Sequence, residues 1–327
     1  MTLRWGTLAA IALFLLPQVE AVAGAWNLPR GATYFKVSFS GFVAENEFDA
    51  DGNVLPFDFE GRYRDRNLVL YGEHGLSDGV ALIGSIPLMS IEYENLFEAG
   101  ETDGLGDFDL GVRVGVAERA AVLSFQGIVK VPGQYEGEPR LPLGNDQYDV
   151  EGRFLVGQSL LRGRLYYGVE AGYRWREREP SDEWRYKLEL GGSITRRLCA
   201  RAKLDGIVSA RNADDVRDVF GNPVLRYEAE LQRVEVSAGY AAGNNPTVEV
   251  SWAPIFAGRN TAKGTTWSAA VIWVWPSGGA RRATERPPGE RLHGDAFGER
   301  AQTPDARRYA AGDPRRGPGA SILRGIR

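Results

Sequence analysis

Apolar and polar residues alternate with a period of two along most of the chain, in separate segments of about ten to fifteen residues. The pattern is clearest between Gly106 and Val116, where one face carries only apolar side chains: Phe108, Leu110, Val112, Val114 and Val116. Because successive side chains of a strand point to opposite sides, such segments are predicted to be strands with one apolar and one polar face. The chain is therefore expected to be all-β.

Twelve segments follow this pattern, and we predict strands at residues 32–43, 61–73, 80–93, 105–116, 121–131, 147–158, 165–176, 184–194, 200–211, 225–240, 246–257 and 265–275. In the tenth segment the apolar residues move from odd positions, as at Leu231, to even positions, as at Val234. A change of parity within one strand predicts a β-bulge near Gln232 and Arg233.

The connections between these strands alternate in length. Those after odd-numbered strands are long, at residues 44–60, 94–104, 132–146, 177–183, 212–224 and 258–264, and those after even-numbered strands are tight, at residues 74–79, 117–120, 159–164, 195–199 and 241–245. Outer-membrane β-barrels have short periplasmic turns and longer outer loops. A soluble β-sandwich also alternates, but it has no reason to sort its loops by strand parity. We therefore predict a transmembrane antiparallel β-barrel of about twelve strands at residues 24–276, in the bacterial outer membrane.

Aromatic residues cluster at both ends of the predicted strands. With a periplasmic N-terminus, one group falls at the outer membrane interface and the other at the periplasmic interface: Trp175, Trp184, Tyr186 and Trp267, and then Tyr240, Trp273 and Trp275. Two aromatic girdles are typical of barrels in lipid.

The two ends of the chain differ from the barrel segment. Residues 1–23 combine Arg4, a short apolar run broken by Pro17 and the small residues Ala21 and Ala23, which predicts a signal peptide cleaved near Ala23. Residues 277–327 hold eleven arginines, no lysine, nine glycines and five prolines, and we predict a disordered basic tail. Two interpretations of this tail stay open: a periplasmic tether, or a non-native extension.

Composition excludes several classes of function. The net charge of −4 gives no reason to expect a nucleic-acid partner, and a single cysteine supports neither an intrachain disulfide nor a cysteine metal site. The two histidines, His74 on a predicted periplasmic turn and His293 in the tail, cannot assist a nucleophile at the outer rim. We therefore expect no enzyme activity and no cofactor.

Three stretches resemble a known family. Residues 70–78 with 82–88 are similar to a "YxEYGLTD…LxxSLP" segment, residues 104–111 to a "GLGDxxLG" strand, and residues 257–260 with 267–275 to a closing hairpin. Together they resemble the outer-membrane channel family named for the meta-pathway of phenol degradation, which implies a transporter-like β-barrel. The chain departs from that family in its long tail and in His74, where the family tends to have tyrosine.

If the apolar faces meet lipid, the charged faces line the interior. The pore-lining candidates are Asp107, Asp109, Arg113, Glu151, Arg153, Glu170, Arg174, Lys187, Glu189, Lys203 and Asp205. Because both signs occur on almost every strand, neighbouring strands are expected to pair them. Two interpretations stay open: a salt-bridged filling of a narrow barrel, or a charged wall that selects solutes. Residues 24–31 are expected to be too few to form a plug.

The predicted outer loops are acidic. We expect these carboxylates to be solvated and to join lipopolysaccharide phosphates through divalent ions. The segment from Asp49 to Asn53 superficially resembles a calcium loop, but its glycine comes two positions too early, so no metal site is predicted.

The sequence thus predicts an outer-membrane channel for passive uptake or efflux of a small solute, with aromatic and hydrophobic compounds as candidates. The alternative is a non-conducting scaffold or a component of surface-polymer export, and an outer-membrane hydrolase ranks last. The expected partners are outer-membrane lipid, lipopolysaccharide, the solute and the barrel-assembly machinery. The pattern does not predict an oligomeric state.

Overall fold

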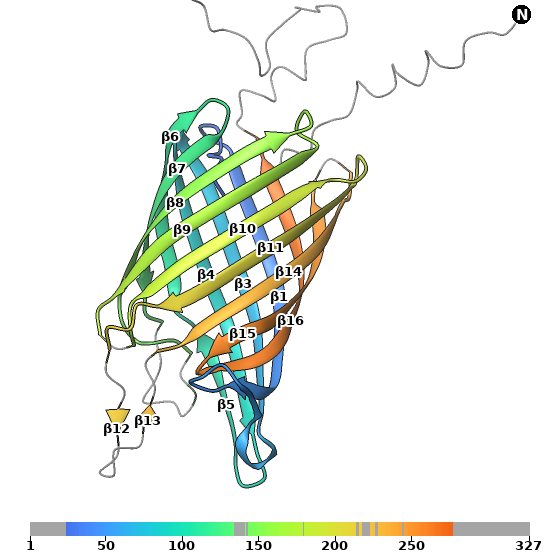
Figure 1. The fold of residues 1–327 in the computed structure, drawn as a ribbon. Helices are drawn as coiled ribbons and strands as arrows, with labels where there is room; N and C mark the ends of the chain where they lie inside the picture. The colour runs from blue at the N-terminus through green and yellow to red at the C-terminus, as the bar shows by residue number, and fades with distance from the viewer. Residues whose placement is uncertain are drawn as a thin grey trace, which may run out of the picture. The chain divides into compact units, whose positions relative to one another are not determined.

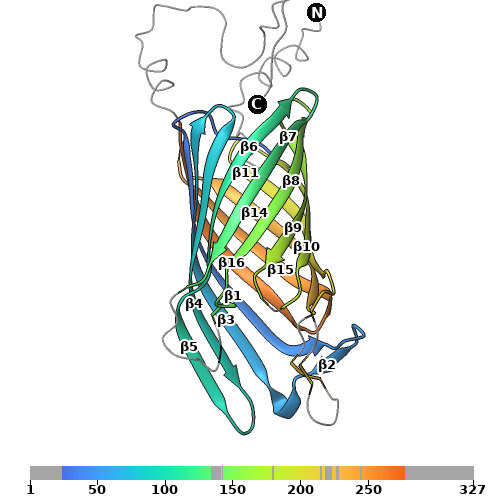
Figure 2. The same ribbon diagram turned by 90° about the vertical axis from the view of Figure 1, so that its left-hand side faces the viewer.

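A computed structural model describes residues 24–276, apart from 134–140, 142, 179, 214–215, 218–222, 226–227 and 244. The predicted signal peptide and the predicted tail lie outside the described residues. Twelve long strands form the body of the described part (Figures 1 and 2): β1 (Thr33–Phe48), β3 (Arg62–Ser77), β4 (Val80–Glu94), β6 (Phe108–Glu118), β7 (Val122–Val131), β8 (Asp149–Leu160), β9 (Leu165–Arg176), β10 (Glu183–Ser193), β11 (Leu198–Ser209), β14 (Glu230–Ala241), β15 (Thr247–Arg259) and β16 (Thr261–Trp275).

These twelve strands pair in chain order, and every pairing is antiparallel. Strand β1 also pairs with β16, from Thr33 opposite Trp275 to Phe48 opposite Thr261. This last pairing closes the sheet into the barrel seen in Figure 1. In lipid, backbone N–H and C=O groups need partners within the protein, and a closed sheet supplies them. The predicted antiparallel twelve-stranded barrel is confirmed.

The two ends of the barrel differ, as the loop lengths predict. At the turn end, short connections at residues 78–79, 119–121, 161–164, 194–197 and 242–246 join the strands. At the loop end, the longer connections contain small elements: β2 (Val54–Pro56), the 3-10 helix η2 (Asp58–Glu60), β5 (Ala99–Leu105), β12 (Val216–Arg217) and β13 (Pro223–Leu225). Among the described residues, no helix has the length and apolarity needed to cross a membrane.

The predicted loop at 258–264 is wrong. Strand β15 continues to Arg259 and β16 begins at Thr261, so Asn260, with a left-handed φ of 48°, makes the connection. Lys263 and Gly264 pair with β1. The alternation disappears here although the strands continue, because the sheet no longer has one apolar and one polar environment on its two sides.

The predicted bulge near Gln232 and Arg233 is right in its position but wrong in its strand, because the extra residue lies on β15. The register between β14 and β15 shifts at this point, where Gln232 lies opposite Ala257 and Arg233 lies opposite Ile255. The extra residue is therefore Phe256 on β15, and β14 itself keeps regular pairing with β11. A bulge on the partner strand explains the local irregularity without reversing the faces of β14.

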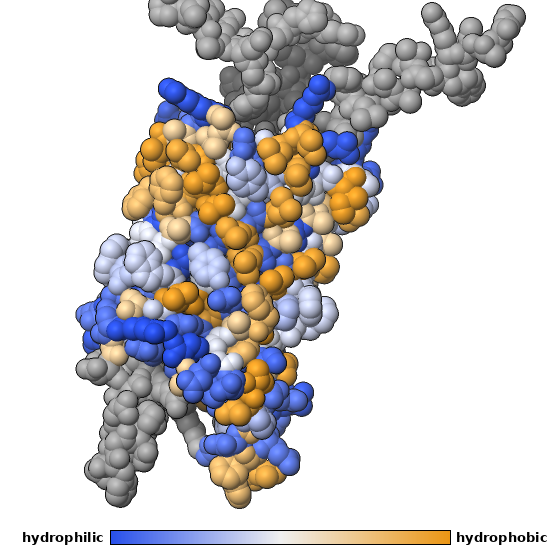
Figure 3. All heavy atoms as spheres, in the orientation of Figure 1, coloured by the Kyte–Doolittle hydropathy of each residue, from blue (hydrophilic) through white to orange (hydrophobic). Residues whose placement is uncertain are grey.

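The barrel is apolar outside and polar inside. On β6, Leu110, Val112 and Val114 are exposed, whereas the side chain of Arg113 between them is buried. Figure 3 shows apolar side chains in a broad band over the outer faces of the barrel strands. Because an exposed Val or Leu forgoes about 1.5–3 kcal/mol of burial free energy in water, such a band is stable only against lipid or another apolar surface.

Candidate functional site

The polar strand faces enclose a charged interior, called the lumen here. Several of its ion pairs join residues that lie directly opposite each other in neighbouring strands. Lys187 of β10 is opposite Glu170 of β9, with 2.5 Å between Nζ and Oε1. Lys203 of β11 is opposite Glu235 of β14, with Nζ and Oε1 2.9 Å apart. Directly opposite side chains have neighbouring Cβ atoms, so the ladder itself brings opposite charges together.

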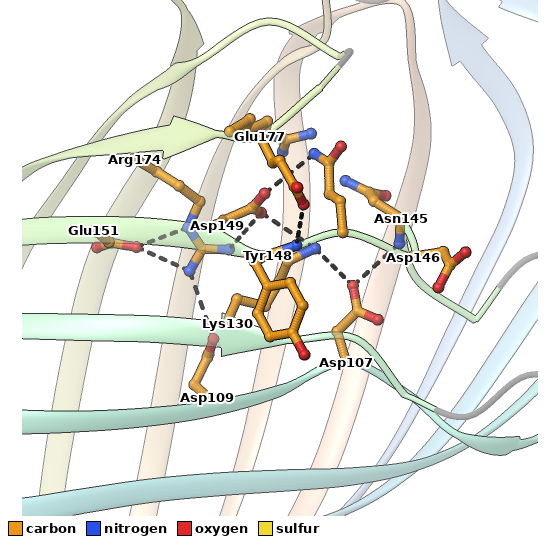
Figure 4. Close-up of polar contacts among 12 residues, drawn as sticks. Asp107, Asp109, Lys130, Asn145, Asp146, Tyr148, Asp149, Glu151, Arg174 and Glu177 are labelled. Atoms are coloured by element: carbon orange, nitrogen blue, oxygen red, sulfur yellow. Dashed lines mark hydrogen bonds and ion pairs between the residues drawn. The ribbon is translucent and has the colours of Figure 1, made fainter.

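A second group of charges lies toward the loop end and is drawn in Figure 4. Arg174 of β9 donates from Nε to Glu151 Oε2 at 2.9 Å, and its Nη2 lies 3.8 Å from Asp109 Oδ1. Lys130 of β7 lies 2.7 Å from Asp107 and 3.1 Å from Asp149. Charges from four neighbouring strands and the residue before β6 therefore form one network.

The segment before β8 is attached to this network. The backbone N–H of Asn145 donates to Asp107 Oδ2 at 3.0 Å, and the backbone N–H of Tyr148 donates to Glu177 at 3.3 Å (Figure 4). Gln147 is fully buried and donates to Asp149 Oδ1 at 3.1 Å. The loop-end network therefore holds residues 145–148 against the lumen wall.

Glu151 and Glu170 connect the loop-end network to the middle of the lumen. Arg153, Arg174 and Arg185 all bond to the buried carboxylate of Glu151. Arg153 also lies 2.8 Å from Glu170, which Lys187 contacts from the other side. The attraction within such buried ion pairs roughly offsets the free-energy cost of removing the charges from water, so the pairs are weak evidence for added stability. Their main effect is to fix the positions of the cations, because each cation is held by one or two carboxylates.

A third group of charges joins strands that are far apart in the sequence. Glu249 of β15 accepts from Lys36 of β1 at 2.8 Å and from Arg201 of β11 at 2.9 Å. Arg233 of β14 donates to Asp205 of β11 at 2.9 Å. The ion pairs thus extend from β6 to β1 around the lumen wall.

A cavity of about 380 Å³ lies between these groups. Its wall comes from strands β8, β9, β10, β11 and β14 and includes Arg153, Glu170, Lys187, Lys203 and Arg233. Ligand pockets commonly measure about 300–1,000 Å³. The lumen is therefore partly filled by paired side chains and partly open.

Residues 24–31 lie in the turn end of the lumen and contact its wall, and the expectation that they are too few to form a plug stays a prediction. The Ala25 carbonyl accepts from Ser124 of β7 at 2.5 Å, and Asn27 donates to the Gly79 carbonyl at 3.0 Å. Ala25 and Leu28 are buried. The segment is therefore packed against the inner side of the barrel.

Trp26 packs against two residues of the wall. Its ring makes an edge contact with Tyr166 of β9, with 6.1 Å between centroids. A Cβ at Gly157 of β8 would lie 2.5 Å from the Trp26 ring, so only glycine leaves room for it. Arg113 donates to the Trp26 carbonyl at 3.1 Å and to both carboxylate oxygens of Glu73. The segment is thus held by side-chain and backbone contacts together.

The pore-lining candidates lie on the lumen faces, and their role in a pore stays a prediction. Ten of the eleven candidates take part in the ion pairs described above. The other candidate, Glu189, accepts a hydrogen bond from Tyr166 Oη at 2.7 Å. The prediction missed several lumen residues: Lys36, Glu73, Lys130, Asp149, Glu183, Arg185, Arg201, Arg233, Glu235 and Glu249. Their position on the same polar faces is the signal that would have found them.

The predicted girdle residues lie on the apolar outer faces, and their contact with the membrane interface stays a prediction. Toward the loop end, Trp184 packs edge-on against Tyr173, with 4.7 Å between centroids. The rings of five girdle residues are exposed, and those of Tyr186 and Trp273 are partly covered: the exposed ones are Trp175, Trp184, Tyr240, Trp267 and Trp275. Tyr186 lies over Gly206 of β11, where a Cβ would be 2.6 Å from its ring.

Two further sequence features have structural roles. His74, expected on a turn, lies within β3, and its Nδ1 is 2.9 Å from Thr33 Oγ1. Asp49 accepts from the backbone N–H groups of Asp51 and Asn53 at 2.8 Å each. Among the described residues, no group of three or more His, Cys, Asp or Glu is arranged to hold a metal ion.

Comparison with known proteins places this barrel among solved outer-membrane barrels. No family model matches the chain, and no curated protein matches it. An outer membrane channel from Pseudomonas putida F1 is similar, with a TM-score of 0.62 and 16% identity over 77% of this chain and 98% of that chain. The NanC porin has a TM-score of 0.44 and 8% identity over 72% of this chain and 98% of that one. A Pseudomonas aeruginosa FadL homologue has a TM-score of 0.42 and 10% identity over 75% and 90%.

The likeness to the Pseudomonas putida barrel concerns the fold. It supports the predicted transporter-like barrel, whereas membership of the phenol-degradation family is not confirmed. A closed twelve-stranded barrel with an apolar outer band belongs in the bacterial outer membrane.

Proposed function

We propose that the chain is an outer-membrane channel for passive movement of a small solute. The observation that carries this proposal is the cavity of about 380 Å³ inside a closed barrel whose outer surface is apolar. The pore-lining candidates would form its wall, orienting or screening the solute without covalent chemistry. Ile207 and Leu231 line the same cavity, so a solute with an apolar part suits it.

Arginines on the outer surface of the barrel favour lipopolysaccharide as a partner. Arg64 and Arg66 lie near the loop end of β3, and their guanidinium groups are 3.2 Å and 2.8 Å from the carboxylate of Glu92. Arg66 is exposed, and arginine binds phosphate through several N–H groups. Insertion by the barrel-assembly machinery remains a prediction that follows from the fold class.

Single-channel recording of the refolded full chain in a planar bilayer tests the channel. We expect a steady conductance that changes when Arg174 is replaced by glutamine, because Arg174 lies in the lumen network. A leucine-to-alanine change at the exposed Leu188 is the matched control and should leave the conductance unaltered. A folded protein that shows no conductance would contradict the proposal.

The second candidate is a non-conducting scaffold, and one observation favours it. Residues 24–31 contact strands β3, β6, β7, β8 and β9 at the turn end and occupy space inside the barrel there. Such a barrel would bind or position another component instead of passing solute. The absence of conductance in the full chain, together with loss of surface polymer in a deletion strain, would favour this function.

A further inference from the structure

We propose that the central cavity is a binding site for a small organic anion, namely a carboxylate with an apolar body. This inference rests on the proposed channel function and specifies its solute. It follows from three properties of the cavity wall: the sign of its charge, the projection of its cations and the position of two aliphatic side chains.

The wall of the cavity carries more positive than negative groups. Among the residues that the structure describes, two carboxylates line it, those of Glu170 and Asp205. Five cationic side chains of the described strands β8, β10, β11 and β14 line it as well: Arg153, Arg185, Lys187, Lys203 and Arg233. Several carboxylates that pair with these cations, including Glu151 and Glu235, lie outside the cavity lining.

The cations also project further into the lumen than their partners. In three of the ion pairs the exposed fractions of the side chains are 26% for Arg185 against 1% for Glu151, 29% for Lys187 against 6% for Glu170, and 36% for Arg233 against 22% for Asp205. Long aliphatic stems carry the Lys and Arg heads away from the wall, whereas carboxylates stay near the backbone. A solute in the cavity therefore meets N–H donors first.

These cations keep donors for a ligand. An ammonium group has three N–H donors and a guanidinium group has five. In the described contacts, Lys187 bonds to Glu170 at 2.5 Å and Arg233 donates from Nη2 to Asp205 at 2.9 Å. A ligand carboxylate can accept from the remaining N–H groups through charge-assisted hydrogen bonds, the strongest kind available here.

The apolar part of the ligand has its own contact surface. Ile207 of β11 and Leu231 of β14 line the cavity although their neighbours on the same strand faces, Asp205 and Arg233, are charged. Leu231 is the residue whose odd position interrupts the alternation in the sequence. Two aliphatic side chains beside a cationic wall suit an aromatic or branched aliphatic acid better than an inorganic anion.

Equilibrium binding to the refolded full chain in detergent tests the site, with benzoate as the probe. Benzyl alcohol keeps the ring but lacks the charge, and acetate keeps the charge but lacks the ring. We expect benzoate to bind more tightly than either, since it alone uses both parts of the wall. Equal binding of benzoate and benzyl alcohol would overturn the inference.

Substitutions locate the binding. Lys187→Gln and Arg233→Gln should each weaken benzoate binding by roughly tenfold, as expected for loss of one charge-assisted contact. Lys36→Gln removes a lumen cation that does not line the cavity and is the matched control, which should leave binding nearly unchanged. Folding of each variant is checked by circular dichroism. If Lys36→Gln weakens binding as much as the other two, the site is wrong.

Conductance in the same samples separates the two proposals. Benzoate at millimolar concentration should interrupt the current of the wild-type channel, and less so that of Lys187→Gln. A conducting barrel that does not bind benzoate would contradict the anion site and leave the channel standing. A non-conducting barrel that binds benzoate through Lys187 would contradict the channel and leave the binding site standing.

Discussion

Arg113 of β6 and Glu73 of β3 form a two-bond ion pair across the intervening strand β4, with distances of 3.0 Å for Nη1–Oε2 and 3.2 Å for Nη2–Oε1. Both side chains are buried, and Tyr71 Oη donates to the same carboxylate at 2.5 Å. Because Arg113 also holds the Trp26 carbonyl, this pair connects the barrel wall to the segment inside the turn end.

Replacing Arg113 by glutamine should destabilise the barrel by about 3 kcal/mol, because it leaves the Glu73 charge buried and unpaired. Adding Glu73→Gln should recover most of this loss. Urea unfolding in lipid vesicles, followed by tryptophan fluorescence, measures the two single variants, Arg113→Gln and Glu73→Gln, and the double variant. If the double variant loses as much stability as the two single changes added together, the pair is not coupled.

Trp26→Ala should increase single-channel conductance. The change removes the ring that packs against Gly157 and Tyr166 and so widens the turn end of the lumen. Trp252→Ala is the matched control, since its exposed ring lies on the outer face against Trp267. An unchanged conductance in Trp26→Ala would show that residues 24–31 do not limit the passage.

Val112→Arg should destabilise the barrel in lipid by roughly 2–4 kcal/mol, the cost of a cation on the lipid face near the bilayer midplane. Val112 is exposed on β6 between two lumen residues, the half-buried Gly111 and the buried Arg113. Val116→Arg places the same charge near the turn end of the strand, where we expect a cost of about 0–1 kcal/mol. Equal losses for the two variants would argue against this orientation in the membrane.

The loop that follows β1 should respond to acid. Hydrogen bonds from the side chain and backbone of Asn53 hold the pKa of Asp49 below its usual value. A lowered pKa means that the contribution of this carboxylate is present above the unfolded pKa of about 3.9 and is lost as the pH falls through the folded value. Protection of the Asn53 amide in hydrogen exchange should therefore decrease only below about pH 4. In Asp49→Ala, that pH dependence should be absent.

The mature chain should begin near Gly24. In the structure Gly24 lies against Glu170, since a Cβ at this position would be 2.5 Å from Glu170 Oε1. Cleavage after Ala23 would place the new α-ammonium group at this end of the lumen segment. Mass spectrometry of the protein purified from outer membranes measures both termini. A mature chain that starts beyond Trp26 would lack the contacts that hold the segment.

Regular alternation was enough to place the twelve long strands approximately and to predict, for most of them, which side chains face outward and which face the lumen. It failed at 258–264, because β15 and β16 extend beyond the part of the barrel where lipid and lumen impose opposite chemistry. It also gave no indication of residues 24–31 in the lumen. Their contacts with Ser124 and Arg113 depend on strands that lie about a hundred residues later in the chain.

The sequence by itself determined the class of fold, because a period of two and the parity of loop lengths are local properties that every strand and turn must satisfy. Only the tertiary structure decided which charges meet. Glu249 of β15 reaches Arg201 of β11 across β14, and it reaches Lys36 of β1 across β16 because barrel closure places β1 beside β16. The cavity beside Lys187 and Leu231 has the same origin: its shape and charge come from side chains of several strands, whose lengths and pairing no single segment specifies.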